Sequence, residues 1–214
     1  MMDVETVVGL VGSLGSIMSA SAGVYDIVVQ KKTNERLALL EKELHNHIND
    51  TTINRELSDD EYNLLVGIVR KTIFYGTKGR IKRFAKITND VMYSGYLDIT
   101  RGEKYVYTIK SLSEQEVAFL ITIYKHIANE GGSGNERFSI VVPSYGGKYQ
   151  DFVEKAFCTI GISHSEWIVV LKKLDNLGII QFASTFIAGG VGYSLSEFGK
   201  EFVCYLLGQC KGAK

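Results

Sequence analysis

An apolar stripe runs through the first thirty residues of the chain. Its members recur at intervals of three, four or seven residues: Val7, Val11, Leu14, Met18 and Tyr25. This spacing places them on one side of a helix, so the pattern predicts a first helix from about Val4 to Lys31. We expect the chain to form a homo-oligomer through these five residues.

A second apolar stripe follows the first: Leu37, Leu40, Leu44 and Ile48. It predicts a second helix from about Asn34 to Asn49. Because two amphipathic helices in succession must bury both stripes, the N-terminal part is expected to form a helical hairpin or bundle.

Three capping boxes mark further helix starts, each a serine followed three residues later by a glutamate: Ser58–Glu61, Ser113–Glu116 and Ser163–Glu166. In such a box the serine hydroxyl and the glutamate carboxylate each accept a hydrogen bond from a backbone N–H near the helix start. The first box predicts a helix that continues to about Ile73, and Gly76 and Gly79 are expected to break it.

The chain is predicted to hold two domains. Residues 1–110 form a helical domain with a small β-hairpin near its end, because "GYLDITRGEKYVYTI" (residues 95–109) alternates around Arg101-Gly102. From residue 111 the predicted order is helix, strand ("RFSIVVPS"), helix ("YQDFVEKAFCTIG"), tight turn, helix, strand, glycine turn, strand and helix. The predicted fold class is therefore mainly α (α+β).

The second domain, residues 111–214, contains a pattern typical of one known fold. A leucine-spaced helix ends in a glycine and two isoleucines, and a glycine turn leads into "GYSLSEFG"; the positions are Leu171, Leu174, Leu177, Gly178, Ile179, Ile180, Gly192, Tyr193, Leu195, Ser196 and Gly199. Leu171 and Leu174 are expected to face the core, and Gly178 to end the helix in a left-handed conformation. Over residues 111–208 the chain resembles the winged-helix domain, a helix-turn-helix variant.

The winged-helix resemblance implies a DNA-binding role for the helix that follows Ser163. Its outward residues Ser165 and Lys172, with Lys173 near the boundary, are the expected contacts. However, residues 111–214 hold nine Lys and Arg against ten Asp and Glu, which is poor material for neutralising phosphates. A module that docks a protein partner or dimerises is therefore the alternative.

A basic run lies in the first domain instead. Seven cations fall within seventeen residues: Arg70, Lys71, Lys78, Arg80, Lys82, Arg83 and Lys86. No acid occurs between Glu61 and Asp90, and Phe74, Tyr75 and Phe84 are interleaved. Such a run can bind the phosphates of a polyanion, or it can be a solvated helix face that meets nearby acids.

The first helix also permits a membrane-associated function. The 20 residues from Thr6 to Tyr25 are uncharged, which is long enough to span a bilayer, but nine of them are Gly, Ser or Thr, so a packed helix is favoured. The segment is similar to the first helix of fungal HeLo-type cell-death domains at Gly9, Leu10, Val11, Ser13, Leu14, Ser16 and Ile17. That resemblance implies an effector that disturbs membranes.

The overall composition adds few constraints. Lys and Arg number 24 and Asp and Glu number 24, so no net charge points to a polyanion. The three cysteines and the acidic N-terminus predict a cytoplasmic protein. No catalytic or metal-ligating spacing occurs, so we expect no enzyme activity, no cofactor and no metal. The predicted function is a winged-helix transcription regulator that binds DNA or docks a protein; the alternative is a membrane-associated defence effector.

Overall fold

The structure is a computed structural model of the 214-residue chain, and it describes residues 4–21, 27–47, 56–129, 161–163, 166–183 and 192–209. These residues form eight helices and one two-stranded sheet. The prediction of a mainly α fold is therefore confirmed. The chain divides into two compact units, Met1–Ser111 (unit 1) and Leu112–Lys214 (unit 2).

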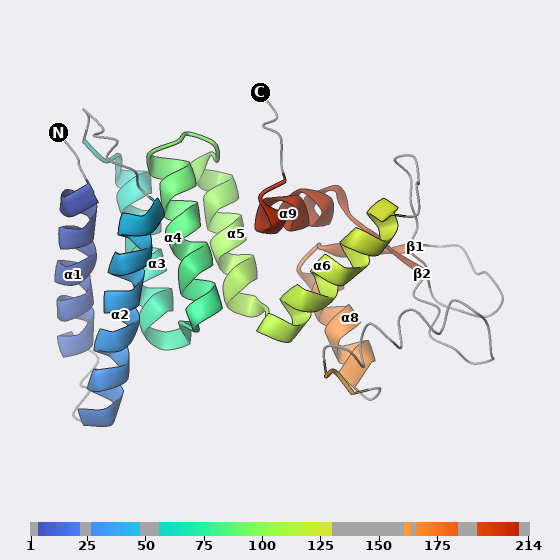
Figure 1. The fold of residues 1–214 in the computed structure, drawn as a ribbon, viewed down its shortest axis with the longest axis horizontal. Coiled ribbons are helices and arrows are strands. Elements are labelled where there is room, and N and C mark those ends of the chain that lie inside the picture. The colour runs from blue at the N-terminus through green and yellow to red at the C-terminus, as the bar shows by residue number, and fades with distance from the viewer. Residues whose placement is uncertain are drawn as a thin grey trace. The chain divides into compact units, whose positions relative to one another are not determined.

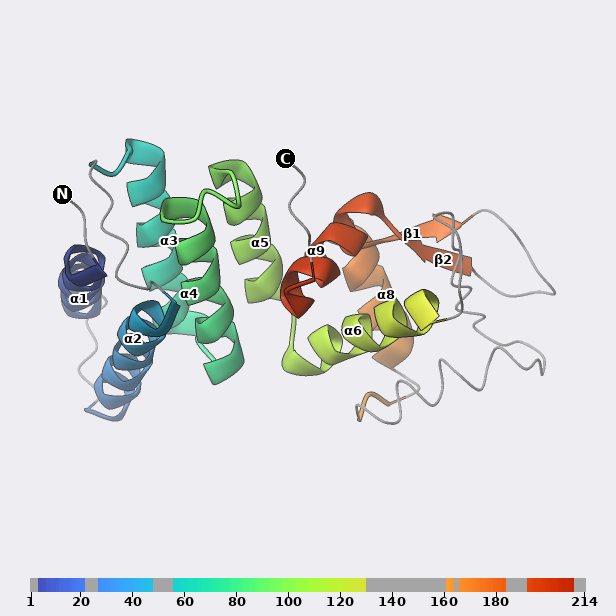
Figure 2. The same cartoon turned by 45° about the horizontal axis from the view of Figure 1, so that its top comes forward.

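Unit 1 is a helical bundle. Its described helices are α1 (Val4–Ser21), α2 (Ile27–His47), α3 (Asp59–Tyr75), α4 (Lys78–Met92) and α5 (Ile99–Ser111). Helix α2 packs against α1, α3 and α4, and α5 packs against α3 and α4, so that the helices lie side by side (Figures 1 and 2). Its core includes Leu40, Leu65, Ile68, Phe84 and Ile109, all fully buried. The predicted N-terminal bundle is confirmed.

The first two helices differ from their predicted bounds. The structure ends α1 at Ser21 and runs α2 without a break from Ile27 through the predicted junction at residues 32–33. The physical reason is Thr33, which is only 3% exposed. Because Thr33 lies four residues before Leu37, it extends the buried stripe of α2 toward the N-terminus and keeps that part of the chain helical.

Helix α1 packs against its own chain. Val7 and Val11 are fully buried, and α1 contacts α2 and α3. At Gly15 an added Cβ would lie 2.5 Å from Cδ1 of Leu37 on α2, whereas at Gly9 it would meet nothing within 4 Å. The small residue at position 15 therefore lets α1 approach α2 closely.

These two glycines predict opposite effects of the same substitution. We expect Gly9→Ala to stabilise the protein by about 1 kcal/mol, because alanine has the higher helix propensity and this position is exposed. Gly15→Ala should destabilise it by about 1–3 kcal/mol, since the new methyl group overpacks against Leu37. Urea unfolding of both variants measures this; an equal gain from both would show that α1 does not pack on α2 through Gly15.

Helices α3 and α4 begin with side-chain caps. The predicted capping box of α3 is present: Glu61 N donates to Ser58 Oγ (3.2 Å) and Ser58 N donates to Glu61 Oε2 (2.9 Å). Gly76 ends α3 as predicted, but Gly79 does not interrupt a helix, because it lies in the first turn of α4. Thr77 caps that turn by accepting a hydrogen bond from Arg80 N (3.3 Å).

The predicted β-hairpin at residues 95–109 is wrong, because the segment forms α5. Its buried residues are Gly102, Tyr105, Val106, Thr108 and Ile109, a set that is dominated by intervals of three and four. Asp98 accepts a hydrogen bond from Arg101 N (2.8 Å) at the helix start. Since a Cβ at Gly102 would lie 2.7 Å from Val91 Cγ2 on α4, glycine here serves close helix packing rather than a hairpin turn.

Unit 2 combines helices with one small sheet. Its described elements are α6 (Glu114–Asn129), α8 (Trp167–Asn176), β1 (Ile180–Ala183), β2 (Gly192–Leu195) and α9 (Glu197–Leu207). The two strands are antiparallel, with Ile180 opposite Leu195. Helix α9 packs against α6 and β2, and α8 packs against β1. The predicted strand "RFSIVVPS", the helix "YQDFVEKAFCTIG" up to residue 160, and most of the glycine turn lie outside the described residues.

Several local predictions for unit 2 are confirmed. Leu171 and Leu174 are buried, and Gly178 has a φ of 67°, the left-handed conformation that ends a helix before a strand. The third capping box forms only in part: Ser163 N donates to Glu166 Oε2 (3.0 Å), but α8 begins later, at Trp167, without a side-chain cap. Two hydrogen bonds lower the pKa of the Glu166 carboxyl below its usual value: the larger effect comes from the Ser163 hydroxyl and the smaller from the Ser163 backbone N–H.

Candidate polyanion-binding surface

Cations from three helices gather where α3 ends. The Lys110 ammonium on α5 lies 4.7 Å from the ring centroid of Tyr75, and Arg80 Nη1 on α4 donates to Tyr75 O (2.9 Å). We name this region the α3-end surface; it comprises Arg70, Lys71, Phe74, Tyr75, Lys78 and Lys110.

The direction of the helices produces this cluster. Gly102 on α5 faces Leu64 on α3, and Lys110, eight residues further along α5, acts electrostatically on Lys71. Helices α3 and α5 therefore run parallel, and their C-terminal ends lie together. Because the C-terminus of a helix carries a partial negative charge, cations are favoured there.

Two arginines at this end have a structural role. Arg36 Nη1 on α2 donates to Ile73 O (2.5 Å), and Arg80 binds Tyr75 O. Both carbonyls belong to the last turn of α3, where backbone oxygens have no partner within the helix. These two guanidinium groups therefore cap α3, and the cations that remain for a ligand are Arg70, Lys71, Lys78 and Lys110.

The Lys71 ammonium is in an unfavourable position when charged. Partial burial, then the neighbouring charges of Lys110 and Arg70, lower the pKa of Lys71 below its ordinary value of 10.5, and Glu103 opposes them with the smallest of the four effects. A bound anion would relieve this repulsion. The α3-end surface is thus a place where the folded chain holds positive charges close together without neutralising them fully.

Removing the Lys71 charge should therefore stabilise the fold. Since the folded-state pKa is lower than the unfolded one, the unfolded chain binds the proton more tightly. The wild-type contribution is unfavourable at neutral pH and is relieved as pH rises through the folded pKa. We expect Lys71→Met to raise stability at pH 7 by about 0.5 kcal/mol after allowance for solvent screening, and this gain to shrink toward pH 10.

Urea unfolding between pH 7 and pH 10 measures this dependence. Lys42→Met, on the exposed side of α2, is the matched control for losing one surface lysine. A Lys71→Met variant less stable than the wild type at pH 7 would contradict the repulsion.

The rest of the predicted basic run is engaged within unit 1. Lys86 Nζ lies 2.5 Å from Asp90 Oδ2, and Lys82 Nζ lies 3.8 Å from Glu43 Oε1. Arg83 is half-buried and has an interaction partner. The run thus divides: Lys82 and Lys86 neutralise acids on the bundle, Arg80 caps α3, and Arg70, Lys71 and Lys78 line the α3-end surface.

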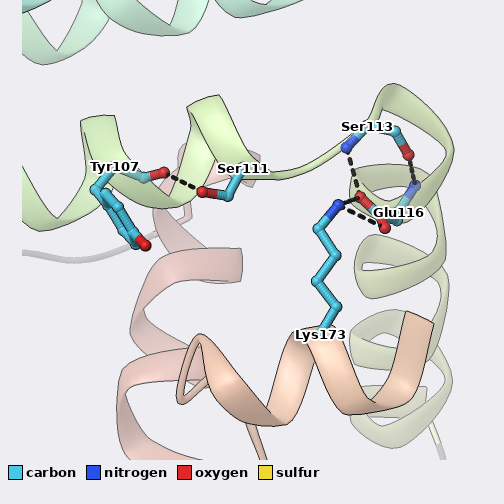
Figure 3. Close-up of polar contacts among 5 residues, drawn as sticks. All are labelled: Tyr107, Ser111, Ser113, Glu116 and Lys173. Atoms are coloured by element: carbon cyan, nitrogen blue, oxygen red, sulfur yellow. Dashed lines mark hydrogen bonds and ion pairs between the residues drawn. The ribbon is translucent and has the colours of Figure 1, made fainter. Parts of the chain in front are cut away.

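The polyanion contacts predicted in unit 2 are not brought together as a site. Lys173 Nζ binds both carboxylate oxygens of Glu116 on α6 (2.9 and 2.7 Å), and Figure 3 shows its side chain reaching from α8 to that carboxylate. Lys173 is therefore held by a buried acid and is not available to a phosphate. Lys172 is exposed on α8, and Ser165 lies outside the described residues.

The five predicted self-association residues are also placed differently from one another. Val7 and Val11 are fully buried within unit 1, so they cannot contact a second copy while α1 stays packed. Leu14 is half-buried; the side chain of Met18 and the whole of Tyr25 lie outside what the structure describes. Self-association stays a prediction.

Lys110 was missed by the sequence prediction. The predicted hairpin ends at residue 109, just before Lys110, and a hairpin gives no reason to connect Lys110 to the run at residues 70–86. The signal that could have identified it is a lysine in the last turn of a helix, where cations are favoured.

No protein-family model, curated protein or solved structure matches this chain. The winged-helix resemblance is therefore wrong as an assignment, since the described residues form eight helices with only a two-stranded sheet and no relative supports that family. The matching residues are explained by local structure. An amphipathic helix needs leucines at helical spacing, a left-handed helix end favours glycine, and a buried strand favours isoleucine.

The resemblance to HeLo-type domains is wrong for a similar reason. Small and apolar residues at these spacings are what any closely packed helix needs, and α1 uses Gly15 and Val11 against its own chain. None of the described helices is long and apolar enough to cross a membrane. In the same described residues, no group of three or more His, Cys, Asp or Glu is placed to hold a metal ion.

Proposed function

We propose that this protein acts without catalysis as a nucleic-acid-binding protein, and that the α3-end surface contacts the phosphates. The observation that carries this proposal is the meeting of cations from three helices at one end of unit 1: Arg70, Lys71, Lys78 and Lys110. In the part of the chain that the structure describes, none of these four forms an ion pair with a carboxylate.

Phosphates suit this surface better than an isolated small anion would. The four cations come from three helices, α3, α4 and α5, so they offer several contact points on one surface. A polyanion offers one charge for each of several cations and releases counterions when it binds. The chain has no net charge, so we expect this attraction to be local and strongly dependent on salt.

The test is binding of the full-length protein to labelled DNA in single-stranded and double-stranded form, by fluorescence anisotropy at low and rising salt. The variant carries Arg70→Gln, Lys71→Gln and Lys110→Gln. Three lost phosphate contacts should reduce the magnitude of the slope of log affinity against log salt by about 2 for single-stranded and about 3 for double-stranded DNA. The control neutralises three exposed lysines of α2, Lys31→Gln, Lys32→Gln and Lys42→Gln, and should change the slope little.

Two outcomes would overturn the proposal. One is that neither form of DNA binds at low salt. The other is that both triple variants lose binding equally, which would assign the effect to net charge alone. If the wild-type protein binds an acidic protein but no DNA, and the triple variant loses that binding, the docking function is favoured instead.

The membrane-effector alternative is less well supported. Val7 and Val11 are buried against the bundle, so presenting this stripe to lipid would require α1 to leave α2 and α3. Exposing that apolar surface would cost the free energy gained by burying it. Flotation of the full-length protein with anionic vesicles tests this alternative directly.

A further inference from the structure

Two aromatic rings are exposed among the cations of the α3-end surface. Phe74 is 51% exposed and Tyr75 is 47% exposed. Their centroids lie 6.4 Å apart with the ring planes tilted by 58°. Two adjacent rings in contact with solvent are not needed for the core of unit 1, which is filled by other side chains.

The Tyr75 ring lies close to a cation, and Phe74 follows a cation by about one helical turn. Arg70 precedes Phe74 by four residues and Lys71 precedes Tyr75 by four, so each pair occupies neighbouring turns on the same side of α3. The Lys110 ammonium lies over the Tyr75 ring, 4.7 Å from its centroid. One turn before it on α5, Tyr107 is 58% exposed, and its ring points away from the helix (Figure 3).

This combination fits unpaired bases better than a duplex. In a duplex the bases are stacked on each other and offer only their edges, whereas an unpaired base can stack its face on an aromatic ring. The cations of the α3-end surface can then bind the phosphates that flank the stacked base.

We infer that the α3-end surface binds single-stranded nucleic acid in preference to duplex, with bases stacked on Phe74 and Tyr75. This inference rests on the proposed function and names its substrate class. Phe74 and Tyr75 act as stacking residues, while Arg70, Lys71 and Lys110 bind phosphates. The preference does not depend on base sequence, because every base has a face that can stack on a ring.

The experiment compares a labelled oligothymidylate with a duplex of the same length, by anisotropy at fixed low salt with the full-length protein. The test variant is Phe74→Leu with Tyr75→Leu, which keeps apolar bulk but removes both rings. We expect single-strand affinity to fall about tenfold or more and duplex affinity to stay within twofold. The control is Tyr62→Leu, an exposed tyrosine (41%) near the other end of α3, which should bind as the wild type.

The outcomes separate this inference from the proposed function. If duplex binds as tightly as the single strand, or if the double variant binds the single strand as the wild type does, the stacking inference is overturned while phosphate binding stands. If neither nucleic acid binds, both are overturned. Circular dichroism melting of each variant confirms that unit 1 is folded, and because both rings are exposed we expect no loss of stability.

Discussion

Gly199→Ala is expected to destabilise unit 2 by about 3 kcal/mol or more. A Cβ at this position would lie 1.9 Å from the carbonyl oxygen of Ile179 and 2.9 Å from its carbon. These are backbone atoms, so they cannot rotate away as a side chain would. Overpacking of a rigid neighbour forces the two segments apart.

The close approach at Gly199 joins the start of β1 to the start of α9. Ile179 O, just before β1, accepts hydrogen bonds from Ser196 N (3.0 Å) and Ser196 Oγ (3.1 Å). The same hydroxyl accepts from Gly199 N (2.9 Å) and caps α9. A side chain at position 199 would therefore disturb the cap of α9 as well as its contact with the strand.

Guanidinium unfolding followed by circular dichroism measures this loss. The matched control is Gly208→Ala at the C-cap of α9, where φ is 67° and an added Cβ meets nothing within 4 Å. This control carries only the strain of a left-handed alanine, about 1 kcal/mol. A Gly199→Ala loss no greater than that of Gly208→Ala would show that the backbone approach at Ile179 is not tight.

Lys173→Met should destabilise unit 2 by about 2 kcal/mol. The substitution leaves the Glu116 carboxylate, whose side chain is 8% exposed, without its cation. An unpaired buried charge is costly, but Glu116 keeps the hydrogen bond from Ser113 N (2.6 Å), which limits the loss. Figure 3 shows that the same carboxylate serves the capping box and the ion pair.

A second substitution should recover most of this stability. In the variant with both Lys173→Met and Glu116→Gln no charge is left buried, and glutamine can still complete a capping box. The four proteins form a double-mutant cycle, measured by denaturant unfolding, with an expected coupling of about 1–2 kcal/mol. Additive losses from the two single variants would mean that the ion pair is not formed in solution.

Capping was predictable from the sequence because it is local. The boxes at Ser58–Glu61 and Ser113–Glu116 both form with reciprocal hydrogen bonds, since a spacing of three residues brings the two side chains together whatever packs around them. The end of α8 at Gly178 was predictable for the same reason. At Ser163 the local pattern formed only half of its contacts, and α8 begins four residues later.

The segment at residues 95–109 shows where local reasoning failed. Tyr105, Tyr107 and Ile109 alternate as in a strand, yet Tyr107 is 58% exposed while Tyr105 and Val106 are buried side by side. Adjacent buried residues belong to a helix that lies on other helices. The packing of Gly102 on Val91 favours the helix over the strand. That contact joins residues of different elements, so the local pattern does not reveal it.

The candidate site was likewise predictable only where its residues are neighbours in the sequence. Arg70, Lys71 and Lys78 were recognisable as a basic run with Phe74 and Tyr75 interleaved. The sequence could not show which cations of that run neutralise the bundle's own acids, as Lys86 does with Asp90. Nor could it show that a lysine on a distant helix, Lys110, completes the surface.

By itself, the sequence determined the mainly helical fold, two helix starts and the presence of a dense positive segment, because spacing and capping act within a few residues. Only the tertiary structure decided that the small-residue face of α1 packs on Leu37 of its own chain, and that Lys173 is held by Glu116. It also decided that parallel α3 and α5 bring Lys71 and Lys110 together. Such contacts join residues far apart in the chain, and their free energy depends on close approach and burial, which side-chain spacing does not encode.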